Sequence, residues 1–509
     1  MSARTLMVQG TASSAGKSLL VTALCRIFRR QGLRVAPFKS QNMALNSFVT
    51  PDGGEIGRAQ AVQAGACGIP PSIDMNPILL KPEGNSRSQV IVRGKAAGSM
   101  SAREYHAEKP RLRGLISECL TRLRDTHDIV VIEGAGSPAE INLKENEIVN
   151  MFVARTADAP VLLVGDIDRG GVFAALVGTM ELLEPAERTR IAAFIINKFR
   201  GDRSLLTPGL DFLSARTGVP VLGVIPYIPK LRIADEDSAS LETRMRAPQS
   251  GAGEIDIAII RLPWISNYDD FDPLAHESGV GVRFVEHAEE LDHPDLLVLP
   301  GSKSTVADLA WLQERGFARI VRERHNAGQP VLGICGGCQM LGQRIHDPHH
   351  TESGAATVDA LGLLPIVTIF HRTKLTAQIE ARSIGRSFLN PCEPATITGF
   401  EIHMGMLEPT GEAGDVAAPF EIIRRNGETV HARDGAASAN GAVVGTMIHG
   451  LFENACVRQA LLSELRRRRG LPAATHSAVP TREAEYDRLA AAVRENIDLP
   501  QLFRIARLS

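Results

Sequence analysis

The sequence predicts an α/β protein of two domains, the first of which has a mostly parallel, doubly wound sheet. Two observations predict this class. In both halves of the chain, short apolar runs without alternation, which are typical of strands buried on both faces, alternate with helical patterns. The alternation lapses once, in the polar stretch RMRAPQSGAGE at residues 244–254. We therefore expect domains over residues 1–243 and 255–469, a linker over 244–254 and a helical tail over 470–509.

The expected elements follow in chain order. Apolar residues at helical spacing predict a helix from Ser18 to Arg30, which Gly32 can end. A further helical pattern runs from Thr305 to Ala327, and beyond Gly470 we expect one more helix. Strands separated by helices favour a parallel sheet. The expected strands are TLMVQG (5–10), LRVAPF (33–38), DIVVIEGAG (128–136), APVLLVGDID (159–168), IAAFIINKF (191–199), VPVLGVIP (219–226), IDIAIIRLP (255–263), VRFVEH (282–287), PDLLVLPG (294–301) and QPVLGICGG (329–337).

Composition excludes several classes of protein. The 509 residues are 44% hydrophobic and 22% charged with a formal net charge of -2, so nothing recruits nucleic acid or an acidic membrane. No run approaches the roughly 18 apolar residues of a membrane span, and the N-terminus lacks the apolar core of a signal peptide. Seven scattered cysteines are too few for a disulfide framework. We expect a cytoplasmic protein without nucleic-acid or membrane partners, and a homo-oligomer stays open.

The stretch VQGTASSAGKS at residues 8–18 predicts a phosphate site. The usual loop, G-x-x-x-x-G-K-[ST], has four residues between its glycines, whereas five separate Gly10 from Gly16 and Thr11 takes the place of the first glycine. An apolar strand precedes the loop and a helix begins at its end, so backbone N–H groups can cradle phosphates while Lys17 reaches them. Ser18 or Thr11 could offer a hydroxyl to Mg²⁺. A plain turn with a capping serine is the alternative.

With its extra residue, the loop at residues 8–18 resembles that of the dethiobiotin synthetase-like family, in which ATP phosphorylates a carboxylate. Such chemistry needs acidic Mg²⁺ ligands. Glu133 ends a predicted strand, where ligands collect in an open α/β sheet, and Asp52 or Glu55 could be the second ligand. Asn197 also follows a strand and could bind an adenine edge, with helix capping as its alternative.

The segment VLGICGGCQMLGQ at residues 331–343 predicts a nucleophile site. It has the form of a strand, a sharp glycine-rich turn and a helix, with Cys335 at the apex. A helix N-terminus favours the reactive thiolate, and the N–H of Gly336 can donate to an oxyanion. Gly301 and Ser302, after another strand, supply a second candidate donor. The pattern G-x-C-x-G-x-Q resembles the nucleophile elbow of class I glutamine amidotransferases.

The general base of this site is predicted to be His449, in GTMIHGLFEN after an apolar strand. Class I enzymes usually have H-x-E here, whereas this chain has His449-Gly450-Leu451, so the third member stays unassigned and Glu453 stays open. A zinc or redox pair of Cys335 and Cys338, or a buried structural cysteine, is the alternative.

Longer blocks resemble the cobyric acid synthase family over about residues 5 to 460. They are PFKSQNMALNS (37–47), EIGRAQAVQA (55–64), MNPILLKP (75–82), EGAGSPAEINL (133–143), DIDRGGVFAAL (166–176), NKFRGD (197–202) and GFEIHMG (399–405). The resemblance implies ATP, Mg²⁺ and glutamine as small-molecule ligands, with no tightly bound cofactor and the corrinoid as substrate. It also lifts a set of polar residues to candidate substrate ligands, although each could equally lie on the surface: Lys39, Gln41, Asn42, Arg58, Asn142 and Glu147.

The activity that this resemblance implies is the amidation of four peripheral carboxylates (b, d, e and g) of adenosylated cobyrinic acid a,c-diamide, which gives cobyric acid in cobalamin synthesis. Three alternatives stay open. They are a sister a,c-diamide synthase, a carboxylate ligase with a degenerate glutaminase domain, and a partition-type switch ATPase, which would have no Cys335/His449 domain.

Overall fold

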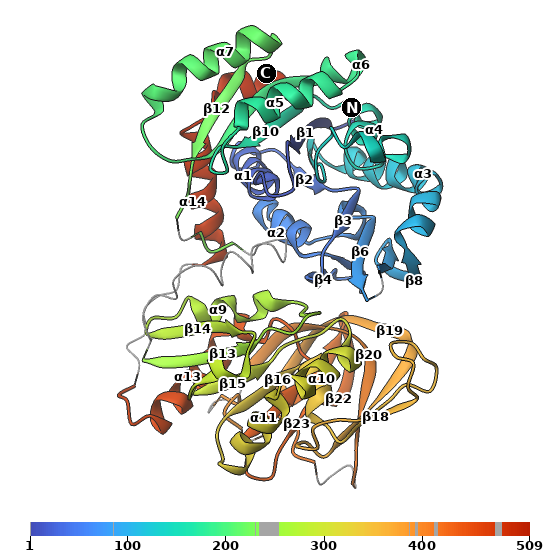
Figure 1. Ribbon diagram of the computed structural model, residues 1–509, viewed down its shortest axis with the longest axis vertical. Coiled ribbons are helices and arrows are strands. Elements are labelled where there is room, and N and C mark those ends of the chain that lie inside the picture. Colours follow the sequence, from blue (N-terminus) through green and yellow to red (C-terminus); the bar gives the residue numbers. More distant parts are fainter. Residues whose placement is uncertain are drawn as a thin grey trace.

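The computed structural model describes residues 2–84, 86–229, 231–233, 254–385, 387–391, 395–411, 416–473 and 481–508. Two α/β domains lie one above the other along the long axis of the molecule (Figure 1). The predicted linker, residues 244–254, lies outside the described residues except for Glu254. No helix within the described ranges has the length and apolar character needed to cross a membrane.

The N-terminal domain is built on one six-stranded sheet with the order β12-β11-β10-β1-β9-β2, in which every neighbouring pair is parallel. All six strands predicted for this half of the chain are present, and together they form this sheet. Because the strands are parallel, their carboxyl ends share one edge, where ligands bind in open α/β sheets. The strands are β1 (Arg4–Gly10), β2 (Val35–Phe38), β9 (Ile129–Glu133), β10 (Val161–Asp166), β11 (Ile191–Phe199) and β12 (Val221–Pro226).

Helices cover the sheet, and two smaller sheets extend the domain toward its neighbour (Figure 1). The helices are α1 (Lys17–Arg30), α2 (Arg58–Cys67), α3 (Ala102–Thr126), α4 (Met151–Ala157), α5 (Val172–Leu182), α6 (Pro185–Arg188) and α7 (Thr207–Thr217), with 3-10 turns η1 (Ile73–Met75), η2 (Ile141–Asn146) and η3 (Arg203–Leu206). The smaller sheets are β3-β6-β7-β8 (Gln41–Met43, Ile78–Glu83, Arg87–Val92 and Lys95–Ser101) and the hairpin β4-β5 (Ser47–Val49 and Glu55–Gly57).

The C-terminal domain has a second six-stranded sheet with the order β14-β13-β15-β16-β24-β23, parallel except for β23. Its first four strands along the chain are those predicted from the sequence. The strands are β13 (Ile255–Ile260), β14 (Val280–Val285), β15 (Leu296–Leu299), β16 (Val331–Ile334), β23 (Ala436–Ala437) and β24 (Val443–Thr446). Helices and turns are η4 (Tyr268–Phe271), α9 (Asp272–Ala275), η5 (Ala288–Leu291), α10 (Thr305–Glu314), α11 (Phe317–Asn326), α12 (Gly336–Leu341), η6 (Leu451–Glu453) and α13 (Ala455–Arg468).

Two features of this domain differ from the sequence prediction. The helical pattern from Thr305 to Ala327 is two helices, α10 and α11, because Gly316 takes a left-handed conformation (φ 82°) between them. A third six-stranded sheet, whose long strands β19 and β20 pair antiparallel, was not predicted. Its strands are β17 (Arg344–His346), β18 (Thr357–Asp359), β19 (Ile366–Ser383), β20 (Thr396–Pro409), β21 (Phe420–Arg425) and β22 (Glu428–Asp434).

The C-terminal tail returns to the N-terminal domain. The prediction of one helix beyond Gly470 is wrong, because the described tail has two, α14 (Arg482–Arg494) and α15 (Leu499–Ile505). Figure 1 shows α14 beside α1, and Leu489, Val493 and Leu502 are buried in the same apolar cluster as the inner face of α1. The apolar residues of the tail therefore complete a hydrophobic core that includes the inner face of α1.

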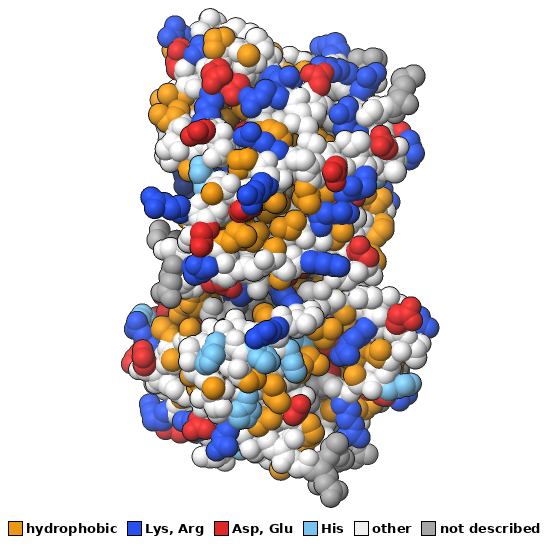
Figure 2. Space-filling view, turned by 90° about the vertical axis from the view of Figure 1, so that its right-hand side faces the viewer, with side chains coloured by type: hydrophobic (Ala, Val, Ile, Leu, Met, Phe, Trp, Pro, Cys, Tyr) orange, Lys and Arg blue, Asp and Glu red, His pale blue; other side chains and the backbone are white. Residues whose placement is uncertain are grey.

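The face of the molecule drawn in Figure 2 carries mixed charge. On the face drawn in Figure 2, Lys and Arg side chains are interspersed with Asp and Glu, and no single-sign field extends over the face. Histidines gather on the lower part, which is the C-terminal domain. This distribution agrees with the formal net charge of -2.

Candidate active site

The phosphate loop connects β1 to α1 at the carboxyl edge of the first sheet. Gly16, which precedes α1, has φ 91°, and a Cβ there would lie 2.2 Å from Nδ2 of Asn197. Only glycine therefore allows the loop to pack this closely against β11. Lys17 is buried, and its Nζ donates to the carbonyls of Ala12 (2.9 Å) and Ser13 (3.1 Å). The loop thus holds the ammonium group over its own backbone, at the place where phosphates bind in such loops.

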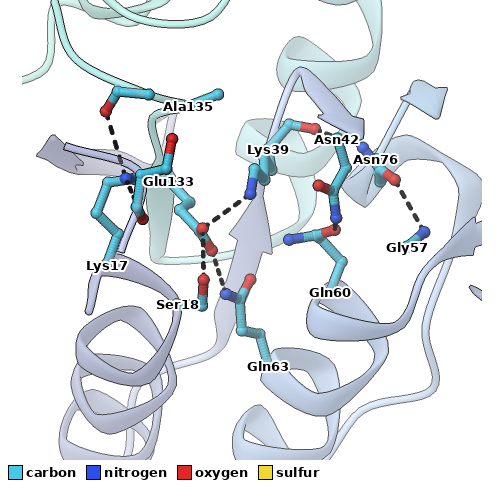
Figure 3. A network of polar contacts seen from close by, with 12 residues as sticks. Lys17, Ser18, Lys39, Asn42, Gly57, Gln60, Gln63, Asn76, Glu133 and Ala135 are labelled. Atoms are coloured by element: carbon cyan, nitrogen blue, oxygen red, sulfur yellow. Dashed lines mark hydrogen bonds and ion pairs between the residues drawn. The ribbon is translucent and has the colours of Figure 1, made fainter. Parts of the chain in front are cut away.

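Glu133 lies at the centre of the polar network beside this loop (Figure 3). Its Oε1 accepts hydrogen bonds from Ser18 Oγ (2.8 Å) and Lys39 Nζ (2.9 Å), and its Oε2 accepts one from Gln63 Nε2 (2.5 Å). The carboxylate is almost completely buried. A hydroxyl and a carboxylate oxygen in contact are hard oxygen donors, which fit Mg²⁺ when nucleotide phosphates complete its coordination. Thr11 lies in the same loop, where its N–H donates to Val164 (2.9 Å).

Neither candidate for the second acidic ligand joins this network. Asp52 is exposed and accepts a hydrogen bond from Thr50 in its own turn. Glu55 is buried, and its two oxygens pair with Lys81 (2.9 Å) and with Lys374 of the C-terminal domain (2.5 Å). Burial raises the pKa of Glu55, but the two lysines outweigh it and hold the pKa well below its usual range. The structure therefore places Glu55 in an ion-pair cluster between the domains.

Asn197 lies on the other side of the loop. Its Nδ2 donates to the carbonyl of Ala15 (2.9 Å), and the following Lys198 donates to Ser14 (2.7 Å) and pairs with Asp166 (2.8 Å). A cavity of about 270 Å³ opens here, with Asn197, Pro226, Tyr227 and Leu19 among its lining residues. An apolar slot with an amide at its edge beside a phosphate loop can hold a nucleobase.

The six candidate substrate ligands separate into groups. Gln41 and Glu147 line a cavity of about 840 Å³ that also reaches Ser13 of the phosphate loop. Glu147 accepts a hydrogen bond from Phe152 N (2.8 Å) and so also caps α4. The other four do not line this cavity: Lys39 contacts Glu133, Asn42 donates to Gln60 (3.0 Å), Arg58 pairs with Asp269 (2.6 Å) and Asn142 is exposed.

Cys335 occupies the sharp turn between β16 and α12, as the sequence predicts. Its φ of 49° and ψ of −107° are strained for a non-glycine residue, which is typical of a nucleophile elbow. The neighbours must be glycine: a Cβ at Gly337 would lie 1.9 Å from the carbonyl oxygen of Leu299. A Cβ at Gly336 would lie 2.9 Å from the backbone nitrogen of Ser302. The amide facing Gly336 is thus that of Ser302, one residue after the predicted Gly301.

His449 completes a Cys–His–Asp arrangement. Its Nδ1 lies 2.6 Å from Oδ2 of Asp270, while Oδ1 of Asp270 accepts a hydrogen bond from Gly450 N (2.8 Å). Both side chains are buried. Burial disfavours the imidazolium, but Asp270 and Cys335 outweigh it and raise the pKa of His449 to about 10. The imidazole is thus oriented by one carboxylate and stabilised in its charged form.

Asp270 was missed by the sequence analysis. It lies in η4, 179 residues before His449, and no local pattern marks it. Glu453, the residue left open for this role, pairs with Arg58 (3.9 Å) and with Arg482 instead. The third member of the arrangement therefore comes from the first crossover of the domain.

Cys338 lies on the other side of α12. It is fully buried, burial raises its pKa well above the usual value, and a Cβ at Gly445 would lie 2.4 Å from its sulfur. Its thiol therefore packs against β24 as a core residue. Among the described residues, no group of three or more His, Cys, Asp or Glu side chains is placed to hold a metal ion.

The pocket around Cys335 is closed by both domains. It has a volume of about 50 Å³ and is lined by Cys335, His449 and Gln339 of the C-terminal domain and by Lys81 and Gln89 of the N-terminal domain. Lys374, which also lines it, has its pKa lowered to about 8 by burial against the opposing charge of Glu55. An amino acid bound in this pocket would therefore have the cationic side chains of Lys81 and Lys374 near its carboxylate.

Comparison with known proteins identifies both domains. Residues 6–241 match the model of the CobQ/CobB/MinD/ParA nucleotide binding domain, and residues 256–457 match that of the CobB/CobQ-like glutamine amidotransferase domain. A cobyric acid synthase of Sorangium cellulosum is 62% identical, with 100% of this chain and 99% of that protein covered. Relatives of the same name from Dehalococcoides mccartyi (strain CBDB1) and Moorella thermoacetica are 52% and 51% identical, each over 99% of this chain and 99% and 98% of their own. The chain therefore belongs to the cobyric acid synthase family of glutamine amidotransferases.

Proposed function

We propose that this protein amidates four peripheral carboxylates (b, d, e and g) of adenosylated cobyrinic acid a,c-diamide, with ATP and glutamine, to give cobyric acid. The observation that carries the amidation chemistry is the presence of two complementary sites in one chain, a phosphate loop with Lys17 and a buried Cys335–His449–Asp270 arrangement. The first suits activation of a carboxylate and the second suits release of ammonia. The corrinoid is the substrate; its identity follows from the similarity to cobyric acid synthases.

Ammonia is released in the C-terminal domain. The Cys335 thiolate attacks the amide carbon of glutamine, and His449, charged beside Asp270, donates the proton with which ammonia leaves. The backbone N–H groups near the elbow, at Gly336 and at Gly301 or Ser302, are the donors for the oxyanion. Water, deprotonated by His449, then hydrolyses the thioester to glutamate and frees the thiol.

The carboxylate is activated in the N-terminal domain. The substrate carboxylate attacks the γ-phosphorus of ATP and ADP leaves, with Lys17 and the N–H groups of the loop from Gly10 to Gly16 neutralising phosphate charge. Ser18 and Glu133, with Thr11 nearby, would hold Mg²⁺, which supplies further charge neutralisation when bound. Ammonia then attacks the acyl phosphate, and phosphate leaves as the amide forms.

Two cavities beside the loop suit the two substrates of this domain. We assign adenine to the cavity of about 270 Å³ at Asn197, and the corrinoid to that of about 840 Å³, which a larger ligand needs. Charged and polar side chains of both signs line the larger cavity: Lys109 suits a carboxylate and Gln41 an amide of the substrate, whereas Arg155 is paired with Glu187 (3.0 Å).

The experiment that tests the proposal is product analysis by mass spectrometry after incubation with ATP, Mg²⁺, glutamine and cobyrinic acid a,c-diamide. We expect successive gains of up to four amides. A sister a,c-diamide synthase would instead convert cobyrinic acid itself and leave the a,c-diamide unchanged. A protein that hydrolyses ATP but forms no amide from either corrinoid would contradict the proposal and favour a switch ATPase.

A further inference from the structure

The turn that carries Asp270 is held by the other domain. Ser47, in the β4-β5 hairpin of the N-terminal domain, donates its N–H to Oδ1 of Asn267 (2.9 Å). Arg58, the first residue of α2, places its Nε 2.6 Å from Oδ2 of Asp269. Asn267 begins the turn in a left-handed conformation (φ 52°), and Asp270 follows Asp269 directly. Two contacts from the N-terminal domain therefore fix the backbone on which the partner of His449 stands.

The imidazole of His449 is also reached through aromatic rings. Phe400 stacks on it, with ring centroids 5.4 Å apart and planes at 22°, and Phe48 of the hairpin packs edge-on against Phe400 at 5.1 Å. The guanidinium of Arg58 lies 5.2 Å from the centroid of the Phe48 ring. Arg58 thus contacts two groups that position His449: Asp269, in the turn that carries Asp270, and the ring of Phe48, which packs against Phe400.

The ion pair of Arg58 and Asp269 is better suited to orienting the η4 turn than to strengthening the association of the two domains. Both side chains are less than a tenth exposed. The desolvation of two buried charges cancels most of the free energy that their attraction provides. An apolar pair of similar size would therefore hold the domains together equally well. What the ion pair adds is a fixed direction for a turn between two domains. The charge of Arg58 also acts on Asp270, the carboxylate that contacts His449.

We propose that Arg58 is a positioning residue for glutamine hydrolysis: through Asp269 it holds the η4 turn that presents Asp270 to His449, so the hydrolytic site is complete only when the two domains are docked. Helix α2, which Arg58 begins, also carries Gln63, the hydrogen-bond donor to Glu133. Helix α2 therefore contacts Asp269, next to the glutamine-hydrolysing site, and Glu133, at the phosphate loop. The inference rests on the glutamine-hydrolysing half of the proposed function and not on the identity of the corrinoid.

The test uses the full-length protein and measures glutamate release from glutamine in steady state. Arg58→Met keeps the length and apolar contacts of the side chain but removes its charge. A misplacement of about 1 Å can cost a reaction roughly 100-fold, so we expect kcat to fall about 10- to 100-fold while KM for glutamine changes less than about 3-fold. Arg58→Lys, which keeps the charge but loses the planar fork, should recover part of kcat.

The matched control is Thr376→Val. Thr376 donates from Oγ1 to the carbonyl of Gly53 in the same hairpin (2.6 Å), so the variant also loses an interdomain hydrogen bond, but one made by β19 and not by the η4 turn. We expect its kcat to stay within about 2-fold of the wild type. Binding of a fluorescent ATP analogue and amidation with ammonium should stay unchanged in both variants, because Arg58 does not touch the phosphate loop.

A second variant and a spectroscopic measurement complete the test. Asp269→Asn should lower kcat as Arg58→Met does, and the double variant should be no worse than either single one, since both remove one interaction. The downfield proton resonance of the hydrogen bond between His449 and Asp270 should weaken in both single variants and persist in Thr376→Val. Wild-type kcat in Arg58→Met or Asp269→Asn overturns the proposal, as does an equal loss in Thr376→Val. An equal loss of ammonium-dependent amidation overturns it in favour of a substrate-binding role for Arg58.

Discussion

Oδ2 of Asp270 lies 2.6 Å from Nδ1 of His449 across 179 residues of chain. The contact fixes which ring nitrogen of His449 faces Cys335, because Nδ1 is engaged and Nε2 is left toward the thiol. It also assigns the third position of the hydrolytic site to a residue from the first crossover of the domain.

The first prediction concerns this carboxylate. Asp270→Asn should lower glutamine-dependent amidation by about 100- to 10,000-fold, since the imidazole loses both its orientation and the charge that stabilises imidazolium. Amidation with high ammonium should stay near the wild-type rate, because the phosphate loop is untouched. The control is Glu453→Gln, which should keep most activity with either nitrogen donor. Loss of glutamine use in Glu453→Gln with retention in Asp270→Asn would reverse the assignment.

The second prediction separates two cysteines in one short segment. Cys335→Ser should lose glutamine-dependent amidation and keep amidation from ammonium, because only this sulfur stands at the elbow beside His449. Cys338→Ser should keep both activities and lose on the order of 1–3 kcal/mol of stability, since it places a hydroxyl in an apolar core. Rates with each donor and thermal unfolding measure the difference. Full glutamine use by Cys335→Ser, or zinc bound by the wild-type protein, would refute the assignment of the nucleophile.

The third prediction concerns Glu133. Glu133→Gln should raise the Mg²⁺ concentration needed for half-maximal amidation, because a neutral amide replaces the buried carboxylate beside Ser18. Glutamate release at the other site should be largely unchanged. The measurement is a Mg²⁺ titration of both reactions, and an identical titration curve for the variant would show that Glu133 is not a ligand.

How far the sequence predicts the molecule depends on how local each signal is. The strands of both parallel sheets up to β16 are correct, because buried parallel strands are continuous apolar runs that need no partner to be visible. Cys335 lies at the predicted turn, His449 lies after an apolar strand as its motif predicts, and Lys17 lies in the expected loop. The antiparallel pair β19-β20 was missed because its partly exposed strands give no such run.

Residues whose surroundings come from distant segments could not be assigned from the sequence. Asp270 has no motif, and its role depends on the fold bringing η4 to His449. From the sequence, Arg58 is a candidate substrate ligand through the family resemblance, and Glu55 is a candidate second acidic ligand for Mg²⁺. In the structure each pairs with a residue of the other domain, Asp269 and Lys374, which no pattern in one segment reveals.

The fourth prediction is a dependence of stability on pH. His449 has a folded pKa of about 10 against an ordinary value of 6.5, so the folded protein retains a proton that the unfolded chain releases. Its contribution is complete below pH 6.5 and is lost as the pH rises toward 10; it is at most ~5 kcal/mol. Burial raises the pKa values of Asp308, Glu352 and Asp434 to about 7. These three groups therefore change the free energy of unfolding at lower pH than His449 does, between about pH 4 and 7.

Denaturant unfolding of the wild type and of His449→Gln between about pH 4 and 10 checks this prediction. The wild type should lose more of its free energy of unfolding than the variant between about pH 6 and 10, whereas both should change alike below pH 6. Parallel curves throughout would show that His449 is not held as an imidazolium.

In the proposed reaction, nitrogen freed at Cys335 is joined to a carboxylate activated at Lys17. The most direct measurement follows the nitrogen: the protein is given cobyrinic acid a,c-diamide, ATP and glutamine labelled with ¹⁵N in its amide, together with unlabelled ammonium at low concentration, and the corrinoid is analysed by mass spectrometry. We expect ¹⁵N in every new amide of the wild-type product, unlabelled product from Cys335→Ser at high ammonium, and no product from Lys17→Ala with either donor. Amides that form without ATP, near-wild-type turnover in Lys17→Ala, or wild-type product without ¹⁵N would contradict the proposed reaction.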